Sequence, residues 1–439
     1  MLAGLLACLA LVSQTALPPQ RVVLDPLDAL DAPSITSSPQ GRAVLAVEDA
    51  RAPTAPDISL LIESAASSHS RIQVAAIRAL GRLERRDIVT DLLKYLRAPA
   101  AATRTEAAFA VAQGMRGERL PLDPSGTQVD GVLQALLSAA DVEKSAAPLG
   151  EIARSLGRLP YERVEQVLRA DAMLCQILSL SNELDVERKA PGSALPALRG
   201  AVAGAELLGR LHGKLTTVSE ELTILLRRLV TGQTTINSKD RPQPQDALQA
   251  LIAVRGLDED TLRLSLASDH ESVRRLASTS LGSGSSTITG TDRADHLRRL
   301  LNDRAELVRY EALRGYVRTQ VRTEGCNPIM EMVADPSLHV ALAAIDAMGD
   351  ACQGDENAVN RATSEARTPP NSGNWQREAH AMVALAKLSK ERAAIALHSH
   401  SRHTVWQVRM YAARAAGILG DTVTLERLAT DDNDNVREA

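Results

Sequence analysis

A short amino-acid phrase recurs along this 439-residue chain: a polar or basic residue, a small apolar stretch, and then a glycine or alanine that we interpret as closing a turn. It reads IQVAAIRALG at 72–81, VRRLA at 273–277 and VRMYAARAAG at 408–417. Copies spaced by about 30 to 50 residues are typical of a solenoid, in which each helical hairpin packs on the next. Because such a stack has no dedicated catalytic cleft, we expect a binding surface.

Composition favours an all-α architecture. Aromatic residues make up 2% of the chain, with a single phenylalanine, Phe109, while alanine and leucine dominate. We therefore expect helices that pack closely through small residues. The net charge is −4 with both signs mixed along the chain, which gives no electrostatic footprint for nucleic acid. The sequence predicts one continuous helical array.

The N-terminus carries an uncharged apolar run from Leu2 to Val12. This run is too short to span a bilayer and predicts a secretory signal over 1–19, with export to the periplasm or cell envelope. No basic residue precedes it, so we expect the true start to lie upstream. The segment LLAC at 5–8 resembles the lipobox of bacterial lipoproteins, which implies a lipid anchor at Cys8. The alternative is an ordinary cleaved signal that removes Cys8.

Helical periodicity starts near residue 57 and continues to 439. Pro, Asp and Ser are frequent over 20–56, which predicts an extended lead-in with one short helix around Leu45. The residues expected to end the inner helices of about ten or eleven hairpins are Gly81, Ala112, Gly157, Gly209, Gly256, Gly282, Val317, Gly349, Ala386 and Gly417. Insertions are expected at 121–126, 232–246, 282–292 and 354–374, where turn residues cluster.

The phrase DHESVR at 269–274 resembles the turn and inner-helix start of a HEAT repeat. In that family an Asp in the turn and an Arg on the inner helix link one hairpin to the next. The resemblance implies a HEAT-like α-solenoid over 57–439. The matching arginines are Arg104, Arg274, Arg309, Arg409 and Arg437. We call the place of these arginines in each repeat the ladder position. Other residues stand at the ladder position in the remaining repeats, where we expect a weaker link between hairpins: Gln73, Leu149, Ala201, Leu248, Ala341 and Glu378.

Two tryptophans, Trp375 and Trp406, stand at equivalent places in neighbouring repeats, each followed by Gln. Equivalent positions predict two rings on one ridge, about 10 Å apart. The ridge lies at the start of inner helices, which line the concave surface of such solenoids. With His403, Arg409 and Tyr411 nearby in sequence, it predicts an aromatic and basic patch that binds a protein or peptide. The alternative is that both tryptophans seal the core between repeats.

His398, His400 and His403 form a His-x-His-x2-His cluster in the turn expected before Trp406. Imidazoles at this density could hold zinc if a loop gathered them around one centre. The sequence supplies no clear fourth ligand. A solvated turn is therefore the preferred interpretation, and we expect neither a metal nor a cofactor.

Cys326 is expected at the start of an outer helix, and Cys352 just after the inner helix of the same hairpin. Antiparallel packing brings these two ends together. In an exported protein this predicts a disulfide that closes a loop of about 25 residues. Two free thiols are the alternative. Cys175 lies in an apolar stretch and is predicted to be a buried small residue.

No spacing of nucleophile, acid and base, or phosphate-loop residues nominates an active site. The sequence therefore predicts a non-catalytic, protein- or peptide-binding scaffold of the cell envelope. From LAVEDAR at 45–51, through the early repeats, to WQVRMY at 406–411, the sequence also resembles bacterial proteins in which HEAT repeats precede a cyclophilin-type peptidyl-prolyl isomerase domain. That resemblance implies an alternative in which a catalytic domain lies downstream. HEAT-like phycobilin lyases are a third possibility, although no pigment-site signature is present.

The last eight residues, DNDNVREA at 432–439, repeat the turn and inner-helix start seen at 269–276. By this register the closing position of the repeat falls near 445, so we expect the chain to be truncated within its last repeat. Sequencing the encoding DNA checks this expectation. A stop codon directly after Ala439 would contradict it.

Overall fold

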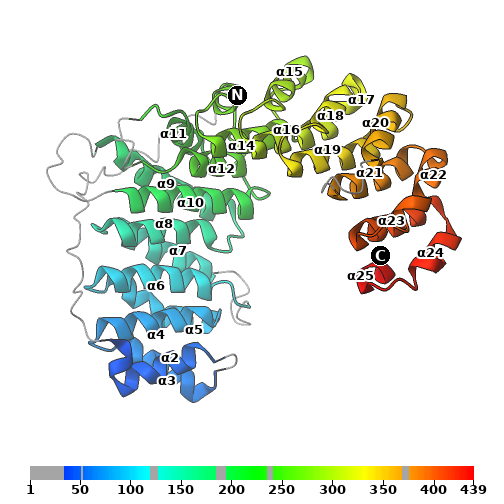
Figure 1. Cartoon of the computed structure of the whole chain (residues 1–439). Coiled ribbons are helices and arrows are strands. Elements are labelled where there is room, and N and C mark those ends of the chain that lie inside the picture. Colours follow the sequence, from blue (N-terminus) through cyan, green and yellow to red (C-terminus); the bar gives the residue numbers. More distant parts are fainter. Residues whose placement is uncertain (1–33, 51–52, 119–126, 184–193, 235–240, 368–374) are drawn as a thin grey trace. The chain divides into compact units, whose positions relative to one another are not determined.

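The computed structural model describes residues 34–50, 53–118, 127–183, 194–234, 241–367 and 375–439. Within these ranges the regular structure is helical, and no strand occurs. Consecutive helices form antiparallel hairpins that stack on one another (Figure 1). The all-α solenoid predicted from the repeats is confirmed. The predicted signal at 1–19, with Cys8, lies outside the described residues.

Contacts between residues cluster into two units, one up to Leu257 and one from Asp258 onward, where the sequence predicted a single array. Each repeat of a solenoid contacts mainly its neighbours, so such an array has no common core that would merge the two clusters. The helices of the first unit are η1 Ile35–Ser37, α2 Pro39–Glu48, α3 Ala55–Ala65, α4 Ser70–Arg82, α5 Arg86–Leu93, η2 Lys94–Arg97, α6 Ala101–Gly114, α7 Thr127–Ala140, α8 Ala146–Arg158, α9 Val164–Glu183, α10 Leu195–His212, α11 Glu220–Thr231 and α12 Pro244–Ala253.

The second unit is a stack of its own. Its helices are α13 Glu259–Leu266, α14 Glu271–Leu281, α15 Gly290–Leu300, α16 Glu306–Thr319, α17 Val321–Glu324, α18 Asn327–Met332, α19 Leu338–Ala351, α20 Glu356–Ala366, α21 Trp375–Leu388, α22 Lys390–His400, α23 Trp406–Leu419, α24 Thr422–Leu428 and α25 Asp434–Glu438. Helices α14, α16, α19, α21 and α23 pack in series as one layer, which we call the inner helices of this unit (Figure 1). In the first unit α4, α6, α8, α10 and α12 are the corresponding inner helices.

Helix α2 is the short helix expected around Leu45. It starts at a proline, and the hydroxyl of Ser38 caps it by accepting a hydrogen bond from the backbone N–H of Gly41. Val44 is fully buried, because α2 packs against α3 and α4. The segment predicted as an extended lead-in is therefore helical over this range, and packed helices begin before residue 57.

Glycines set the distance between neighbouring inner helices. A Cβ atom at Gly81 of α4 would lie 2.6 Å from the Cα atom of Ala110 on α6, and one at Gly282, directly after α14, would lie 2.5 Å from the Cα atom of Gly315 on α16. These distances leave no room for a side chain. Gly282 is the C-cap residue of α14, at the end of an inner helix as the sequence predicted, and Gly81 lies one residue before the end of α4. The close approach of two helices requires glycine at both positions.

The same packing is repeated along α8 and α10. A Cβ atom at Gly200 would lie 2.0 Å from the carbonyl oxygen of Gly150, and one at Gly157 would lie 2.1 Å from that of Gly204. Backbone therefore lies against backbone at two levels of this helix pair. Close packing through small residues, expected from the scarcity of aromatic rings, is the means by which these repeats bury their inner helices.

A matched pair of glycine substitutions tests this packing. Gly200→Ala should lower the free energy of unfolding by about 1 to 3 kcal/mol, because the added methyl group meets backbone atoms. Gly131→Ala, on helix α7, meets nothing within 4 Å. It should raise stability by about 0.5 to 1 kcal/mol through helix propensity. Urea denaturation of both variants measures the two effects, and equal stabilisation by both would contradict close backbone contact at Gly200.

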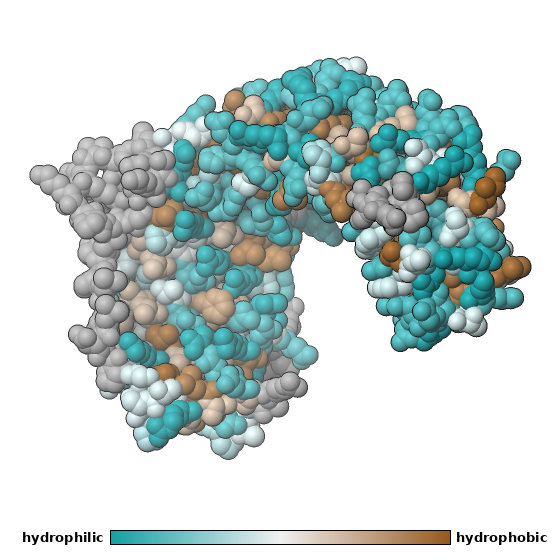
Figure 2. Space-filling view, in the orientation of Figure 1, coloured by the Kyte–Doolittle hydropathy of each residue, from teal (hydrophilic) through white to brown (hydrophobic). Residues whose placement is uncertain are grey.

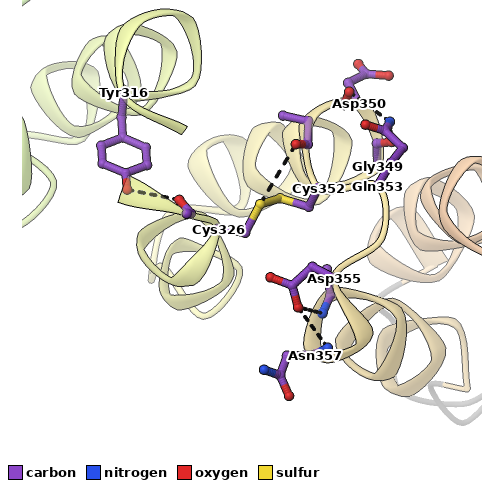
Figure 3. The surroundings of a disulfide bond; sticks show 11 residues. Tyr316, Cys326, Gly349, Asp350, Cys352, Gln353, Asp355 and Asn357 are labelled. Carbon is purple, nitrogen blue, oxygen red and sulfur yellow. Dashed lines mark hydrogen bonds between the residues drawn. A yellow bond between two sulfur atoms is a disulfide. The ribbon is translucent and has the colours of Figure 1, made fainter. Parts of the chain in front are cut away.

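Cys326 and Cys352 form a disulfide in the second unit. Cys326 is the N-cap residue of α18, and Cys352 is the C-cap residue of α19, as the sequence placed them. Their sulfur atoms are 2.06 Å apart and their Cα atoms 6.0 Å apart. Figure 3 shows the bridge beside Tyr316, whose hydroxyl donates a hydrogen bond of 3.0 Å to the carbonyl oxygen of Gly325. Side chains from three helices thus fix the turn before α18.

Reduction of this disulfide should destabilise the second unit. By loop-entropy reasoning a bridge over this span contributes about 3 kcal/mol. The melting temperature in dithiothreitol should fall to that of the Cys326→Ser/Cys352→Ser variant, which should not respond to the reductant.

Burial raises the pKa of the Cys175 thiol to about 12. That thiol should label only on unfolding, so rapid labelling of more than one cysteine in the native protein would contradict the bridge.

Candidate functional site

Arginines on the inner helices bind acidic side chains of the following repeat. Arg309 of α16 donates two hydrogen bonds, of 2.7 and 2.8 Å, to the carboxylate of Asp335. It also donates to the carbonyl oxygen of Asp303 in its own turn, at 2.9 Å. Asp335 in turn accepts the backbone N–H of Ser337 at 2.8 Å. One arginine thus holds two consecutive turns, and we call this unit a rung.

Rungs recur at the positions where the sequence resembles HEAT repeats. The other pairs are Arg104 with Glu143, Arg274 with Asp303, and Arg409 with Asp431. Arg437 donates to the carbonyl oxygen of Asp431, in the same manner as Arg309 does in its own turn. In every pair the acidic residue stands six positions before the ladder position of its own repeat. Arg409, which the sequence placed in a recognition patch, is engaged in a rung.

The rung at the end of the second unit depends on pH. The hydrogen bond from Arg409 lowers the pKa of Asp431 well below its usual range, which outweighs the opposing effect of burial. A carboxyl group with a depressed pKa stabilises the fold above the unfolded pKa of about 4, and this stability is lost as pH falls through the folded value. The rung of Arg409 with Asp431 therefore weakens in acid.

Two adjacent arginines test the contribution of a rung. Arg274 is 7% exposed and binds Asp303, which is 11% exposed, whereas Arg275 is exposed. Arg274→Ala should cost about 3 to 5 kcal/mol, because it leaves a largely buried carboxylate unpaired. Arg275→Ala should change stability by less than about 0.5 kcal/mol. Burial alone would raise the pKa of Asp303, but hydrogen bonds from Arg274 and from the backbone N–H of Ala305, together with charge attraction to Arg274, outweigh it and lower that pKa.

The pH dependence of the Arg274→Ala variant provides a second measurement. The difference in unfolding free energy from the wild type should be largest above about pH 5 and should shrink as Asp303 is protonated in acid. Denaturation at several pH values measures this difference. A difference that stays constant down to about pH 2 would contradict an electrostatic rung.

The two tryptophans are partly buried at the starts of α21 and α23. Trp406 packs together with Met410 against Ala413, Leu428 and Val436, which form the small core of the last repeat. This contact corresponds to the alternative in which the ring seals the repeat.

The histidine cluster is divided by the end of α22. His398 is exposed, and its ring lies beside the guanidinium of Arg402 at 2.9 Å. His400 is still within the helix and is 3% exposed, while the side chain of His403 is 10% exposed. The prediction of a solvated turn is wrong for His400 and His403, because α22 extends further than expected and turns His400 inward. Among the residues that the structure describes, no group of three or more ligating side chains could hold a metal ion.

Tyr411 belongs to a chain of side chains that crosses three inner helices. Its hydroxyl lies 3.0 Å from Nε2 of His380, and Nδ1 of His380 lies 2.7 Å from the carboxylate of Asp346. A carboxylate can only accept, so His380 donates to Asp346 and accepts from Tyr411 when it is neutral. The rings of His380 and Tyr411 are 4.8 Å apart, and the guanidinium of Arg414 lies 4.9 Å from the Tyr411 ring centroid.

A second aromatic pair lies on neighbouring inner helices. The rings of Tyr310 on α16 and His339 on α19 are 4.4 Å apart, and the Arg314 guanidinium lies 5.7 Å from the Tyr310 ring centroid. A groove of about 410 Å³ between these helices is lined by Tyr310, Arg314 and Asp346, among others. We define the inner-helix surface as Tyr310, Arg314, His339, Asp346, His380 and Tyr411. The structure thus brings Tyr411 together with residues that the sequence analysis missed, and separates it from His403 and Arg409.

Register could have identified part of this surface. His380 and Tyr411 both stand two residues after the ladder position of their repeats, and Arg314 and Asp346 both stand five residues after it. Stacked repeats place equivalent positions side by side. Comparison of aligned repeats, rather than of the nearest residues in sequence, would have grouped them.

Hydrophobic residues do not form a large patch on the face shown in Figure 2, where small brown areas are scattered over a mainly hydrophilic surface in each unit. Among the described residues, Ile395 and Val423 are the most exposed large hydrophobic side chains. No helix within the described ranges is long and apolar enough to cross a membrane.

The sequence matches no protein-family profile and no curated protein. Solved structures are similar in fold. Kap121p bound to the extreme C-terminus of the protein phosphatase Cdc14p gives a TM-score of 0.54 at 14% identity, covering 91% of this chain and 46% of that chain. Kap121p bound to the SUMO protease Ulp1p gives 0.54 at 14%, covering 93% and 47%. Importin beta gives 0.54 at 13%, covering 94% and 60%.

These similarities show the fold alone, a helical solenoid similar to that of Kap121p and importin beta. The chain spans from about half to three-fifths of the length of these neighbours. The similarity is to a helical solenoid, and nothing in it bears on a cyclophilin-type domain.

Proposed function

We propose that this protein is a non-catalytic scaffold that binds a protein or peptide segment on the inner-helix surface of its second unit. The chain from Asp346 through His380 to Tyr411 is the observation that carries this proposal. It sets polar and aromatic groups from three repeats at adjacent positions. Two other candidates from the sequence, Trp406 and Arg409, are instead engaged in packing and in a rung.

The chemistry of this surface suits peptide recognition. Tyrosine and arginine side chains are enriched among the residues that contribute most to protein interfaces. Asp346 is half exposed, so its carboxylate can accept a hydrogen bond from a partner as well as from His380. The Kap121p structures support the proposal, because a protein with a similar fold is seen there bound to a segment of Cdc14p and to Ulp1p.

Export to the cell envelope is part of the proposal. Disulfides persist in oxidising compartments and are rare in the cytosol, so the Cys326–Cys352 bridge supports export. The apolar segment from Leu2 to Val12 supports it as well. A lipid anchor at Cys8 and a downstream isomerase domain rest on sequence resemblance alone.

Selection of peptides from a displayed library against the purified protein tests the binding surface. Tyr310→Ala and Tyr411→Ala should each weaken the selected peptide by about 2 kcal/mol, or roughly 30-fold, with a small change in melting temperature. Val423→Ala is the control, because Val423 is 77% exposed on α24 and is not part of the inner-helix surface. It should leave binding unchanged.

Trp406→Ala separates packing from recognition in the same assay. Loss of a core ring should lower stability by about 3 kcal/mol. If the Trp406→Ala protein kept its melting temperature but no longer bound the peptide, Trp406 would belong to the recognition surface. Unchanged binding in both tyrosine variants would contradict the proposed site.

A further inference from the structure

One rung of the second unit has its acidic and basic residue types exchanged. Glu378 on α21 stands at the ladder position that Arg309 and Arg409 occupy in other repeats. The facing turn carries His403 where the other turns carry an acidic residue such as Asp335. The backbone pattern is nevertheless kept. Nδ1 of His403 accepts the N–H of the residue two positions later at 3.0 Å, as the carboxylate of Asp335 does at 2.8 Å.

A second histidine joins this inverted rung, which we define as Glu378, His400 and His403. Nε2 of His400 lies 3.4 Å from one carboxylate oxygen of Glu378, and Nε2 of His403 lies 3.9 Å from the other. The three side chains are 9%, 4% and 10% exposed respectively. Both Nε2 atoms are buried without a hydrogen bond. A buried carboxylate therefore faces two imidazoles whose protonation decides the energy of the contact.

The hydrogen bonds of His403 fix its protonation state. Its Nδ1 accepts from the backbone N–H of Val405, and a backbone N–H can only donate. Nδ1 therefore carries no proton, and His403 is a neutral ring with its proton on Nε2, directed toward Glu378. This tautomer leaves no lone pair on Nε2 for a metal ion.

His400 is held in the opposite arrangement. Its Nδ1 lies 2.8 Å from the carbonyl oxygen of Ala396, which can only accept, so Nδ1 carries a proton. In a neutral ring Nε2 then has a lone pair, and this lone pair faces the carboxylate of Glu378. The contact is repulsive unless His400 gains a second proton, which converts it into a charge-assisted hydrogen bond.

Four other charged or titratable groups on the packed helices have partners of their own. Arg377 on α21 pairs with Glu365 of α20, and Arg409 on α23 pairs with Asp431. Arg427 on α24 donates to the carbonyl oxygen of Ser401, and His398 on α22 lies beside Arg402. The groups that face Glu378 in the inverted rung are thus His400 and His403.

We propose that the inverted rung is a proton-operated joint between α21 and the end of α22, where the turn toward α23 begins, closed when His400 is protonated and strained when it is neutral. Imidazole changes its charge between about pH 5 and pH 8, a range in which the arginine rungs keep theirs. Acid therefore strengthens this joint, whereas it weakens the rung of Arg409 with Asp431. It connects α21, which carries His380, to the turn that leads into the helix of Tyr411, but the inference does not depend on the proposed peptide binding.

Glu378→Gln should raise the melting temperature at one pH and lower it at another, which the substitution of a merely structural residue would not do. A glutamine amide can donate to the Nε2 lone pair of neutral His400, but it forms no ion pair with the protonated ring. At about pH 8 the variant should melt about 2 to 5 °C above the wild type, and at about pH 5.5 it should melt below it by a similar amount. His398→Asn removes an exposed imidazole from the same helix and should shift both temperatures equally or not at all. A Glu378→Gln shift of the same sign at both pH values would overturn the proposal.

Nitrogen chemical shifts of the histidine rings give a readout independent of stability. In ¹⁵N-histidine-labelled protein, His400 should carry protons on both nitrogens at about pH 5.5 and on Nδ1 alone at about pH 8, while His403 should keep its proton on Nε2. Assignment by the His400→Asn and His403→Asn variants identifies the signals. A neutral His400 with its proton on Nε2 would overturn the proposal. Stabilisation of the wild type by added zinc at about pH 8, absent in Glu378→Gln, would also overturn it in favour of a metal site.

Discussion

Where an inner helix carries the ladder arginine, the stacking of its repeat on the next depends on the bidentate pair between that arginine and the acidic residue of the next turn. Each guanidinium satisfies carbonyl groups of its own turn and the carboxylate of the next, and each carboxylate also binds its own backbone. The planar fork of arginine fits this geometry, whereas lysine would supply a single point charge. Register between repeats is thereby fixed by hydrogen bonds rather than by the shape of the core alone.

Close packing through small residues also holds neighbouring inner helices together. A chain with 2% aromatic residues cannot fill wide gaps between helices, so the inner helices must approach until glycine and alanine touch. The rungs act at the turns and the glycines act along the helices. Together they explain how a sequence with few large side chains buries its interior.

The sequence predicted the parts of the fold that follow from local spacing. Arg274 and Arg309 could be placed on rungs because the family pattern repeats within a few residues, and Cys326 and Cys352 could be paired because both ends of one hairpin meet. The inner-helix surface could not be predicted in full, because Asp346 and His380 belong to different repeats and only stacking brings them together. His400 was misplaced because the sequence analysis put the histidine cluster in a turn. No helix-stop signal precedes His400 in the last turn of α22, and the helix continues through it.

The backbone contact between α8 and α10 also determines where the first unit can bend. No side chain lies between Gly150 and Gly200, or between Gly157 and Gly204, so neither level of the pair has rotamers that could rearrange under load. A bending force applied to this unit would meet a stiff segment there. Bending would instead occur at interfaces filled by longer side chains, which can change rotamer. Elasticity along the stack is consequently uneven, and its distribution is determined by the placement of four glycines.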